Sequence, residues 1–195
     1  MAWDTEATRR KLLAAGARQF AAHGLAGARI DAIGRDAGVN KERIYRYFGD
    51  KERFFGAVLA EELRGILDGI HLEGEGPVAL AGFARELLAR CARHPELGRL
   101  LGWESLELDR PAAAETRREI CADVAGRIRA SLPGISRETA EQLLLSTIVL
   151  ATGVDSLVRI ADTVLGSPAQ HEARAAEVVV HVEALAASAQ AAANR

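Results

Sequence analysis

The chain has 195 residues, of which 49% are hydrophobic and 27% charged, a composition that fits one or two compact domains and excludes a largely disordered chain. The formal charge of -2 conceals an uneven distribution, because residues 1–55 carry a net charge of +4 and residues 56–195 a net charge of -6. A polyanionic partner is therefore compatible with the N-terminal part, although the total charge alone does not suggest one.

Sequence motifs for metal binding, secretion or catalysis are absent. Cys91 and Cys121 do not form a CxxC pair and the five histidines lack metal-ligand spacing, which indicates neither a metal site nor a disulfide framework. The sequence has no GxSxG, P-loop or HExxH motif and no GxGxxG after a strand, so we expect no enzyme activity and no cofactor. Without a signal peptide or an apolar run of 18 residues, the chain is expected to be cytoplasmic.

Helical spacing of apolar residues runs through the whole chain. Ala and Leu recur every three to four residues and runs of alternating Val, Ile and Thr are absent, which predicts an all-α fold of about nine helices. Gly or Pro interrupts this period and divides the chain into segments of different length. The interruptions fall at Gly24, Gly38, 48–50, 74–77, 109–111, 132–134 and 166–168.

The first and fourth helices frame the N-terminal part of the chain. Thr8 is expected to cap a helix over residues 8–23, which Gly24 ends in a left-handed conformation. Asp50 is expected to cap a longer helix that crosses the charge boundary near residue 55 without a linker. The basic and acidic parts should therefore be mechanically coupled.

Between these two helices, a pair of short helices is joined by a tight turn. The first is expected over residues 30–37, Gly38 permits the left-handed turn, and Asn40 caps the second. This is the geometry of a helix-turn-helix, whose second helix enters the major groove of DNA. The residues expected to face inward are Val39, Ile44 and Phe48. The candidate DNA-binding residues are Arg29, Asn40, Lys41, Glu42, Arg43, Tyr45, Arg46, Tyr47 and Lys51.

These segments resemble the TetR family of one-component transcriptional regulators. The similarity is carried by TRRKLLAAGARQFAAHG (Thr8–Gly24) and by IDAIGRDAGVNKERIYRYFGDKERFF (Ile30–Phe55). The resemblance implies a three-helix helix-turn-helix DNA-binding domain in residues 1–55. It further implies that a fourth helix joins this domain to a larger helical effector-binding and dimerisation domain in residues 56–195.

The resemblance also implies roles for individual side chains. It gives phosphate contacts to Tyr45, Tyr47 and Lys51, and contacts with base edges or backbone to Lys41, Glu42 and Arg46. This chain departs from the family pattern at Ala28 and Arg29, where the family usually has Thr or Ser, so the usual hydroxyl cap is absent and Arg29 is expected to substitute electrostatically.

Several of these side chains have an alternative role that does not involve DNA. Glu42 either accepts a hydrogen bond from a cytosine amine or orients Arg46, or else it only supports the helix N-terminus and pairs with Arg46 one turn away. Tyr45 and Tyr47 either bind phosphate or pack beneath the recognition helix. Arg43 is expected to be a solvated charge or a phosphate contact.

Two long helices near the C-terminus, over about 137–162 and 170–189, are too apolar for a free surface. The family resemblance implies that they pair with a second copy in a four-helix bundle, although ordinary intrachain packing would also bury them. A two-fold dimer would read a palindromic operator. The apolar stripes comprise Leu143, Leu144, Thr147, Ile148, Ala151, Leu157 and Val158, and Ala173, Ala176, Val179, Val180, Ala184 and Ala187.

The resemblance implies a ligand pocket in the middle of the chain. Its predicted residues are Phe83, Leu87, Cys91, Leu100, Trp103, Cys121, Ser146 and Thr147. Because few of these are aromatic, a small apolar effector is favoured over a stacked planar one. Trp103 is at least equally compatible with a core anchor, and the two cysteines with plain packing.

The sequence therefore predicts a ligand-responsive transcriptional regulator, a repressor that binds a palindromic operator as a homodimer and that a small apolar effector releases. The alternative is a dimeric small-molecule-binding or interaction protein that does not bind an operator.

Overall fold

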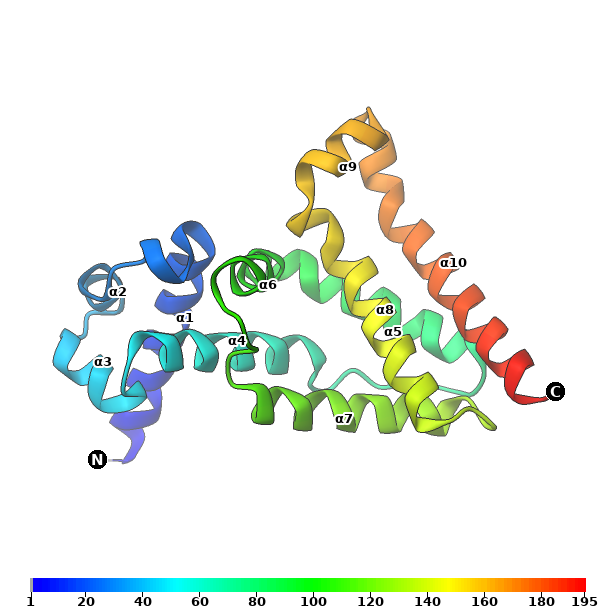
Figure 1. Ribbon diagram of the computed structural model, residues 1–195, viewed down its shortest axis with the longest axis horizontal. Coiled ribbons are helices and arrows are strands. Elements are labelled where there is room, and N and C mark those ends of the chain that lie inside the picture. Colours follow the sequence, from blue (N-terminus) through cyan, green and yellow to red (C-terminus); the bar gives the residue numbers. More distant parts are fainter. Residues whose placement is uncertain (1) are drawn as a thin grey trace. The chain divides into compact units, whose positions relative to one another are not determined.

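The computed structural model describes residues 2–195, and the side chains of residues 5–153, 157 and 159–195. Within these residues ten helices follow one another and no strand occurs, which confirms the all-α prediction (Figure 1). The helices are α1 (Ala2–Gly27), α2 (Ile30–Ala37), α3 (Lys41–Phe48), α4 (Lys51–Leu67), α5 (Pro77–Arg93), α6 (Glu96–Glu107), α7 (Ala114–Ser131), α8 (Arg137–Ser156), α9 (Val158–Leu165) and α10 (Pro168–Ala193).

Two helix breaks were not among the interruptions predicted from Gly and Pro, and the structure has ten helices where about nine were predicted. α5 ends before His94 (φ -129°, ψ 64°), because a residue that precedes proline, here Pro95, is sterically excluded from the helical region. The single helix predicted over 137–162 is wrong, since Leu157 (φ -119°, ψ 40°) separates α8 from α9. Neither Gly nor Pro stands at Leu157, and the apolar period on both sides gives no sign of the break.

The described chain divides into two compact units. Unit 1 comprises residues up to 65 together with 95–117, and unit 2 comprises 66–94 together with 118–195. This division does not follow the boundary predicted at residue 55, because most of α4 and all of α6 belong to unit 1. The assignment of DNA binding to residues 1–55 and of effector binding to 56–195 concerns function and remains a prediction.

Unit 1 is built around a cluster of aromatic rings. Phe20 of α1 contacts Phe54 and Phe55 of α4 edge to face, with ring centroids 5.4 and 5.3 Å apart. Phe48, at the end of α3, stacks on Phe54 at 4.3 Å. Such aromatic pairs each contribute about 0.5–1.5 kcal/mol beyond their buried area, so α3 is fixed firmly to α1 and α4.

α1 is longer than predicted and is broken near its end. It begins at Ala2 rather than at Thr8, because no Gly or Pro stops the helix between them and the Thr8 side chain is buried. Gly24 has the predicted positive φ (71°, with ψ -179°), but it interrupts the helix instead of ending it, and helical pairing continues to Gly27. The helical backbone therefore stops after His23, as predicted, and a further short helical segment follows Gly24.

Side chains of α6 complete the hydrogen bonds that this break leaves open. Arg99 Nε and Trp103 Nε1 both donate to the carbonyl of Ala21, at 2.8 and 3.1 Å. One turn further on, Glu107 Oε2 accepts the N–H of Ala26 at 3.0 Å. Because residues 99, 103 and 107 are four apart, they lie on one face of α6, and that face holds both halves of α1.

Unit 2 contains α5, most of α7, α8, α9 and α10, with α9 at the apex between α8 and α10 (Figure 1). Its core includes the fully buried Phe83 of α5 and Val178 and Val182 of α10. Arg90 of α5 donates to the carbonyls of Ile66 and Asp68, which anchors the C-terminal end of α4 in unit 2.

None of the helices in the described part of the chain is both long and apolar enough to cross a membrane.

Candidate nucleic-acid interface

The turn between α2 and α3 has the sharp geometry that the sequence predicts. Gly38 is left-handed (φ 67°, ψ 33°), and the N–H of Val39 donates to the carbonyl of Gly34 at 2.8 Å. A Cβ atom on Gly34 would lie only 2.6 Å from the carbonyl oxygen of Val39, so this position also requires glycine. The need for glycine at position 34 was not predicted, because it depends on how closely the next segment approaches.

α3 begins and ends as predicted and buries one face. The N–H of Arg43 donates to Oδ1 of Asn40 at 3.0 Å, which confirms Asn40 as the N-cap. Ile44 and Phe48 are buried, while Val39 is only half-buried. The two buried side chains fix which side of the short helix faces solvent.

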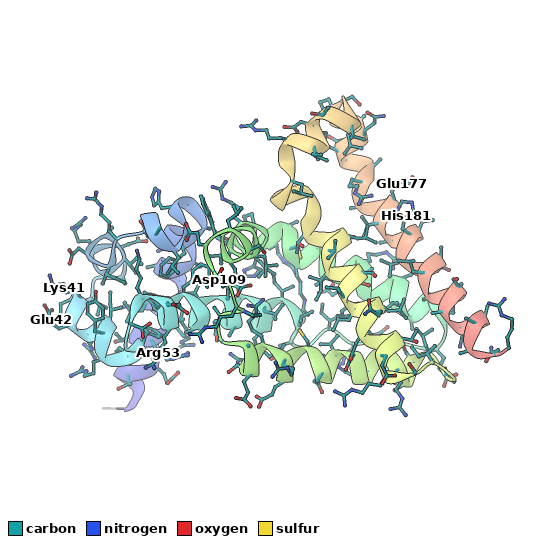
Figure 2. The ribbon with its side chains drawn as sticks, viewed as in Figure 1. Lys41, Glu42, Arg53, Asp109, Glu177 and His181 are labelled. Atoms are coloured by element: carbon teal, nitrogen blue, oxygen red, sulfur yellow. The ribbon has the colours of Figure 1, made fainter. Side chains whose placement is uncertain are left out.

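The exposed face of α3 carries Lys41, Glu42, Tyr45 and Arg46. Lys41 Nζ lies 3.8 Å from Oδ1 of Asp31 in α2, an exposed ion pair that contributes little to stability. Figure 2 shows Lys41 and Glu42 projecting outward from the start of α3. No ion pair between Glu42 and Arg46 occurs among the described side chains, so the predicted alternative for Glu42, pairing within the helix, does not form.

Two of the side chains predicted to bind phosphate have acceptors inside unit 1. The hydroxyl of Tyr47 donates to the carbonyl of Thr5 at 3.2 Å, and Lys51 Nζ donates to the carbonyl of Ala26 at 3.1 Å. Both side chains are half-buried, as is Arg43. Tyr47 and Lys51 therefore connect α1 to α3 and α4 in this structure.

The N-terminus of α2 lacks a side-chain cap. Arg29 occupies the cap position with extended backbone and an exposed side chain, and it makes no capping hydrogen bond. Ala28 is buried. N–H groups in the first turn of a helix and an exposed guanidinium such as that of Arg29 can bind an anion, while Asp31 in the same turn adds a negative charge.

The predicted pocket residues are distributed over the two units. Leu100 and Trp103 lie on α6 in unit 1, where Trp103 supports α1 as described above, and the other six lie in unit 2. Phe83, Leu87 and Thr147 are buried in the core, and the Thr147 hydroxyl donates to the carbonyl of Leu143 at 2.7 Å. Cys91 and Cys121 line separate hollows, and Ser146 is half-buried.

A hollow of about 790 Å³ lies within unit 2 between α5, α8 and α10. Its apolar part includes Leu88, Cys91, Leu150 and Val178, and its polar residues are Arg85, His171, Arg174 and Glu183. None of the α10 residues that line this hollow belongs to the predicted pocket, because the apolar residues of α10 are expected to serve dimerisation. A hollow of this size suits a small organic ligand.

The apolar residues predicted for dimerisation are mostly buried on α8 and mostly exposed on α10. On α8 Leu143, Leu144 and Ala151 are buried inside unit 2, so these residues serve the intrachain core. On α10 every predicted residue except Val179 is exposed. Leu157 is exposed, and the side chain of Val158 lies outside the described residues.

A different apolar face of α8 remains open to solvent. Leu145 and Val149, one turn apart, are 55% and 56% exposed, and Val180 of α10 is 59% exposed. These three residues do not all coincide with the stripes predicted from periodicity, which name Val180 but not Leu145 or Val149, and the pairing of the two helices with a second copy remains a prediction.

Among the residues described, no group of three or more His, Cys, Asp and Glu side chains is arranged to hold a metal ion.

Comparison with known proteins places the helix-turn-helix segment in a family. Residues 12–58 match the family described as "Bacterial regulatory proteins, tetR family". Over 125 residues, or 63% of its length, the chain is 38% identical to the HTH-type transcriptional repressor SCO4008 of Streptomyces coelicolor. This similarity spans 64% of that repressor, which is slightly less than two thirds of its length.

Solved structures extend the similarity to nearly the full chain. SCO4942 from Streptomyces coelicolor is 29% identical with a TM-score of 0.67, over 91% of this chain and 97% of that one. The transcriptional regulator FadR from Bacillus subtilis, solved in complex with stearoyl-CoA, is 15% identical with a TM-score of 0.62. It covers 89% of this chain and 96% of its own, and at this identity the likeness concerns the fold alone.

Proposed function

Since this chain belongs to the TetR family of bacterial regulatory proteins, we propose that it is a DNA-binding transcriptional repressor that acts in the cytoplasm. The observation that carries the proposal is the exposed face of α3, where Lys41, Tyr45 and Arg46 follow a sharp glycine turn. The family comprises regulators rather than enzymes, so we assign the chain no catalytic reaction.

In this proposal α3 lies in the major groove of the operator. Lys41 and Arg46 contact base edges or phosphates, and Tyr45 donates its hydroxyl to a phosphate oxygen. Glu42 accepts a hydrogen bond from a cytosine amine, which is the base-edge group a carboxylate recognises. Arg29 contacts the backbone at the start of α2, where a hydroxyl cap is missing.

We propose that two copies pair through the exposed apolar residues of α8 and α10. Leu145, Val149 and Val180 are large apolar side chains that a second copy would remove from water. A two-fold pair would present two α3 helices about 34–36 Å apart, which corresponds to one turn of B-DNA and to a palindromic operator.

An apolar effector would bind in the hollow between α5, α8 and α10 and release the DNA. α4 can transmit the effect of the effector to the DNA-binding helices. Its first 15 residues belong to unit 1, while Arg90 holds its C-terminal end in unit 2. The effector would favour the conformation that does not bind DNA. A coupling free energy of about 1–3 kcal/mol would lower operator affinity by roughly 5-fold to 150-fold. The fold shared with a stearoyl-CoA-bound regulator is compatible with an effector that has a long apolar chain.

Selection of bound sequences from random duplex DNA tests the proposal. We expect enrichment of one palindrome, and Arg46→Ala should weaken binding to it by about 5-fold to 150-fold through loss of a base or phosphate contact. Arg129→Ala, at an exposed arginine of α7, provides the control and should leave affinity unchanged. A wild-type protein that enriches no sequence would reject operator binding.

A dimeric small-molecule-binding protein without operator binding is the second candidate. It is favoured by the missing cap at Arg29 and by the engagement of Tyr47 and Lys51 with backbone carbonyls of α1. If this candidate is correct, the DNA selection enriches no sequence, whereas an apolar ligand binds saturably to the hollow in unit 2.

A further inference from the structure

A smaller hollow with a different chemistry lies within unit 1, between α1, α4 and the start of α7. Its volume is about 310 Å³. Three arginines line it, Arg9 from α1 and Arg53 and Arg64 from α4. The remaining lining residues are Ala57, Ala60, Ala113 and Thr116. No acidic residue belongs to this lining in the part of the chain that the structure describes.

Two of the three arginines make only surface ion pairs, while the half-buried Arg9 places its guanidinium 5.9 Å from the centroid of the Phe48 ring. Arg53 Nε lies 3.4 Å from a carboxylate oxygen of Asp50, and the Arg53 side chain is 78% exposed. Arg64 pairs with Glu61 one turn earlier on α4 at 2.9 Å, also at the surface. Exposed pairs of this kind contribute about 0–1 kcal/mol, so an anion with two or more negative charges competes with them readily.

Small residues leave the hollow open and a fixed turn forms its wall. Ala57 and Ala60 are three residues apart on α4, so their methyl groups share one face of the helix. Ala113 has a positive φ of 48°, and its backbone nitrogen is 3.1 Å from the place of a Cβ on Gly56. The segment before α7 is therefore packed directly on α4, and the hollow exists without a ligand.

We propose that this hollow binds phosphate groups of a small molecule. Arginine forms paired hydrogen bonds with phosphate oxygens, and a threonine hydroxyl such as that of Thr116 provides a further donor. Arg64 stands 11 residues after Arg53, about 16 Å further along α4, so the hollow extends away from α3. Because the hollow is concave and extends away from α3, it suits a small ligand better than the backbone of a DNA duplex. The inference is independent of the operator and of the effector proposed above.

Calorimetric titration of the full chain with pyrophosphate at low ionic strength tests the site. We expect saturable binding by the wild type, weakened about tenfold or more by Arg9→Gln or Arg64→Gln, since each removes a charge-assisted hydrogen bond. Arg18→Gln is the matched control, because Arg18 is an exposed α1 arginine paired with Asp36 and lies outside the hollow. Ala57→Leu should abolish binding by filling the hollow while all charges remain.

Three outcomes would overturn the proposal. The first is absence of pyrophosphate binding by the folded wild type at millimolar concentration. The second is equal weakening by Arg18→Gln and Arg64→Gln, or undiminished binding by folded Ala57→Leu, either of which indicates diffuse attraction to a basic surface. The third is a loss of DNA affinity in Arg9→Gln without any pyrophosphate binding, which would assign the arginine to DNA phosphates alone. Circular dichroism establishes that each variant is folded.

Discussion

Glu42 stands apart among the exposed residues of α3 because it is a carboxylate on a face otherwise rich in cations. Its charge favours the helix N-terminus, yet beside DNA it is repelled unless a cytosine amine donates to it. The absence of an ion pair with Arg46 leaves the carboxylate available for such a contact. A substitution of Glu42 can therefore change the preference for one base and the general affinity for DNA in opposite directions.

Glu42→Gln is expected to reduce the preference for cytosine at one position of each half-site by about 5-fold to 150-fold. Binding to unrelated DNA should become tighter, because one negative charge is removed from the interface. Competition binding with operators that differ at single positions measures both effects. Glu119→Gln on α7 serves as the control, and an unchanged base preference in Glu42→Gln would contradict base recognition.

Gly24 is a second position where one residue has a large effect, because it forms the break in α1 that packs against α6. Its positive φ disfavours any side chain, and a Cβ there would lie 2.5 Å from Oε1 of Glu107 and 2.9 Å from the Trp103 ring. Gly24→Ala is expected to lower the free energy of unfolding by about 1–3 kcal/mol, as urea denaturation would measure. Gly65→Ala, in an exposed part of α4 with open space around it, should instead stabilise by about 0.5–1 kcal/mol. Equal effects at the two glycines would contradict this account.

Individual residues show which features of the site could be predicted from the sequence. The Asn40 cap and the Gly38 turn could be predicted, because both depend on backbone within a few residues. Gly34 and the partners of Tyr47 and Lys51 could not, because each contact joins segments whose approach depends on packing.

Among the elements, α6 has a role that its sequence does not reveal. Arg99, Trp103 and Glu107 donate to or accept from backbone groups of α1 that lie about 80 positions earlier in the chain. A pattern of apolar periodicity contains no information about such partners. The sequence therefore predicted a stop at Gly24, where the structure has an interrupted helix supported by a distant one.

Glu107→Ala is expected to expose the N–H of Ala26, because the carboxylate is its hydrogen-bond acceptor. Amide hydrogen exchange at Ala26 should accelerate by about tenfold, which corresponds to an opening free energy lower by roughly 1.4 kcal/mol. Glu107→Gln retains an oxygen acceptor and should restore most of the protection. An exchange rate at Ala26 that is the same in all three proteins would rule out this support.

For the whole molecule, the apolar residues of α8 and α10 raise the question of association. The sequence predicts pairing of both helices with a second copy or, alternatively, intrachain packing, and on α8 the chain itself buries several of the predicted residues. α8 is apolar around most of its circumference, so spacing alone leaves the outward face undetermined. The residues predicted for the ligand pocket are distributed over both units, and their role in effector binding remains a prediction.

The double variant Val149→Glu with Val180→Glu is expected to convert the dimer to a monomer, since charges would be buried without partners in the proposed interface. Light scattering coupled to gel filtration measures the mass, with a dimer predicted for the wild type at micromolar concentration. Val78→Glu on α5, at another exposed valine, is the matched control and should remain dimeric. A monomeric wild type would contradict the proposed pairing.

The most direct measurement of DNA recognition by α3 is the salt dependence of affinity for the selected palindrome and for a scrambled duplex of equal length. We predict that both affinities fall steeply as salt rises, because phosphate contacts release counterions, while the palindrome stays bound at least about a thousandfold more tightly at moderate salt. Equal affinity for the two duplexes at every salt concentration would contradict the account.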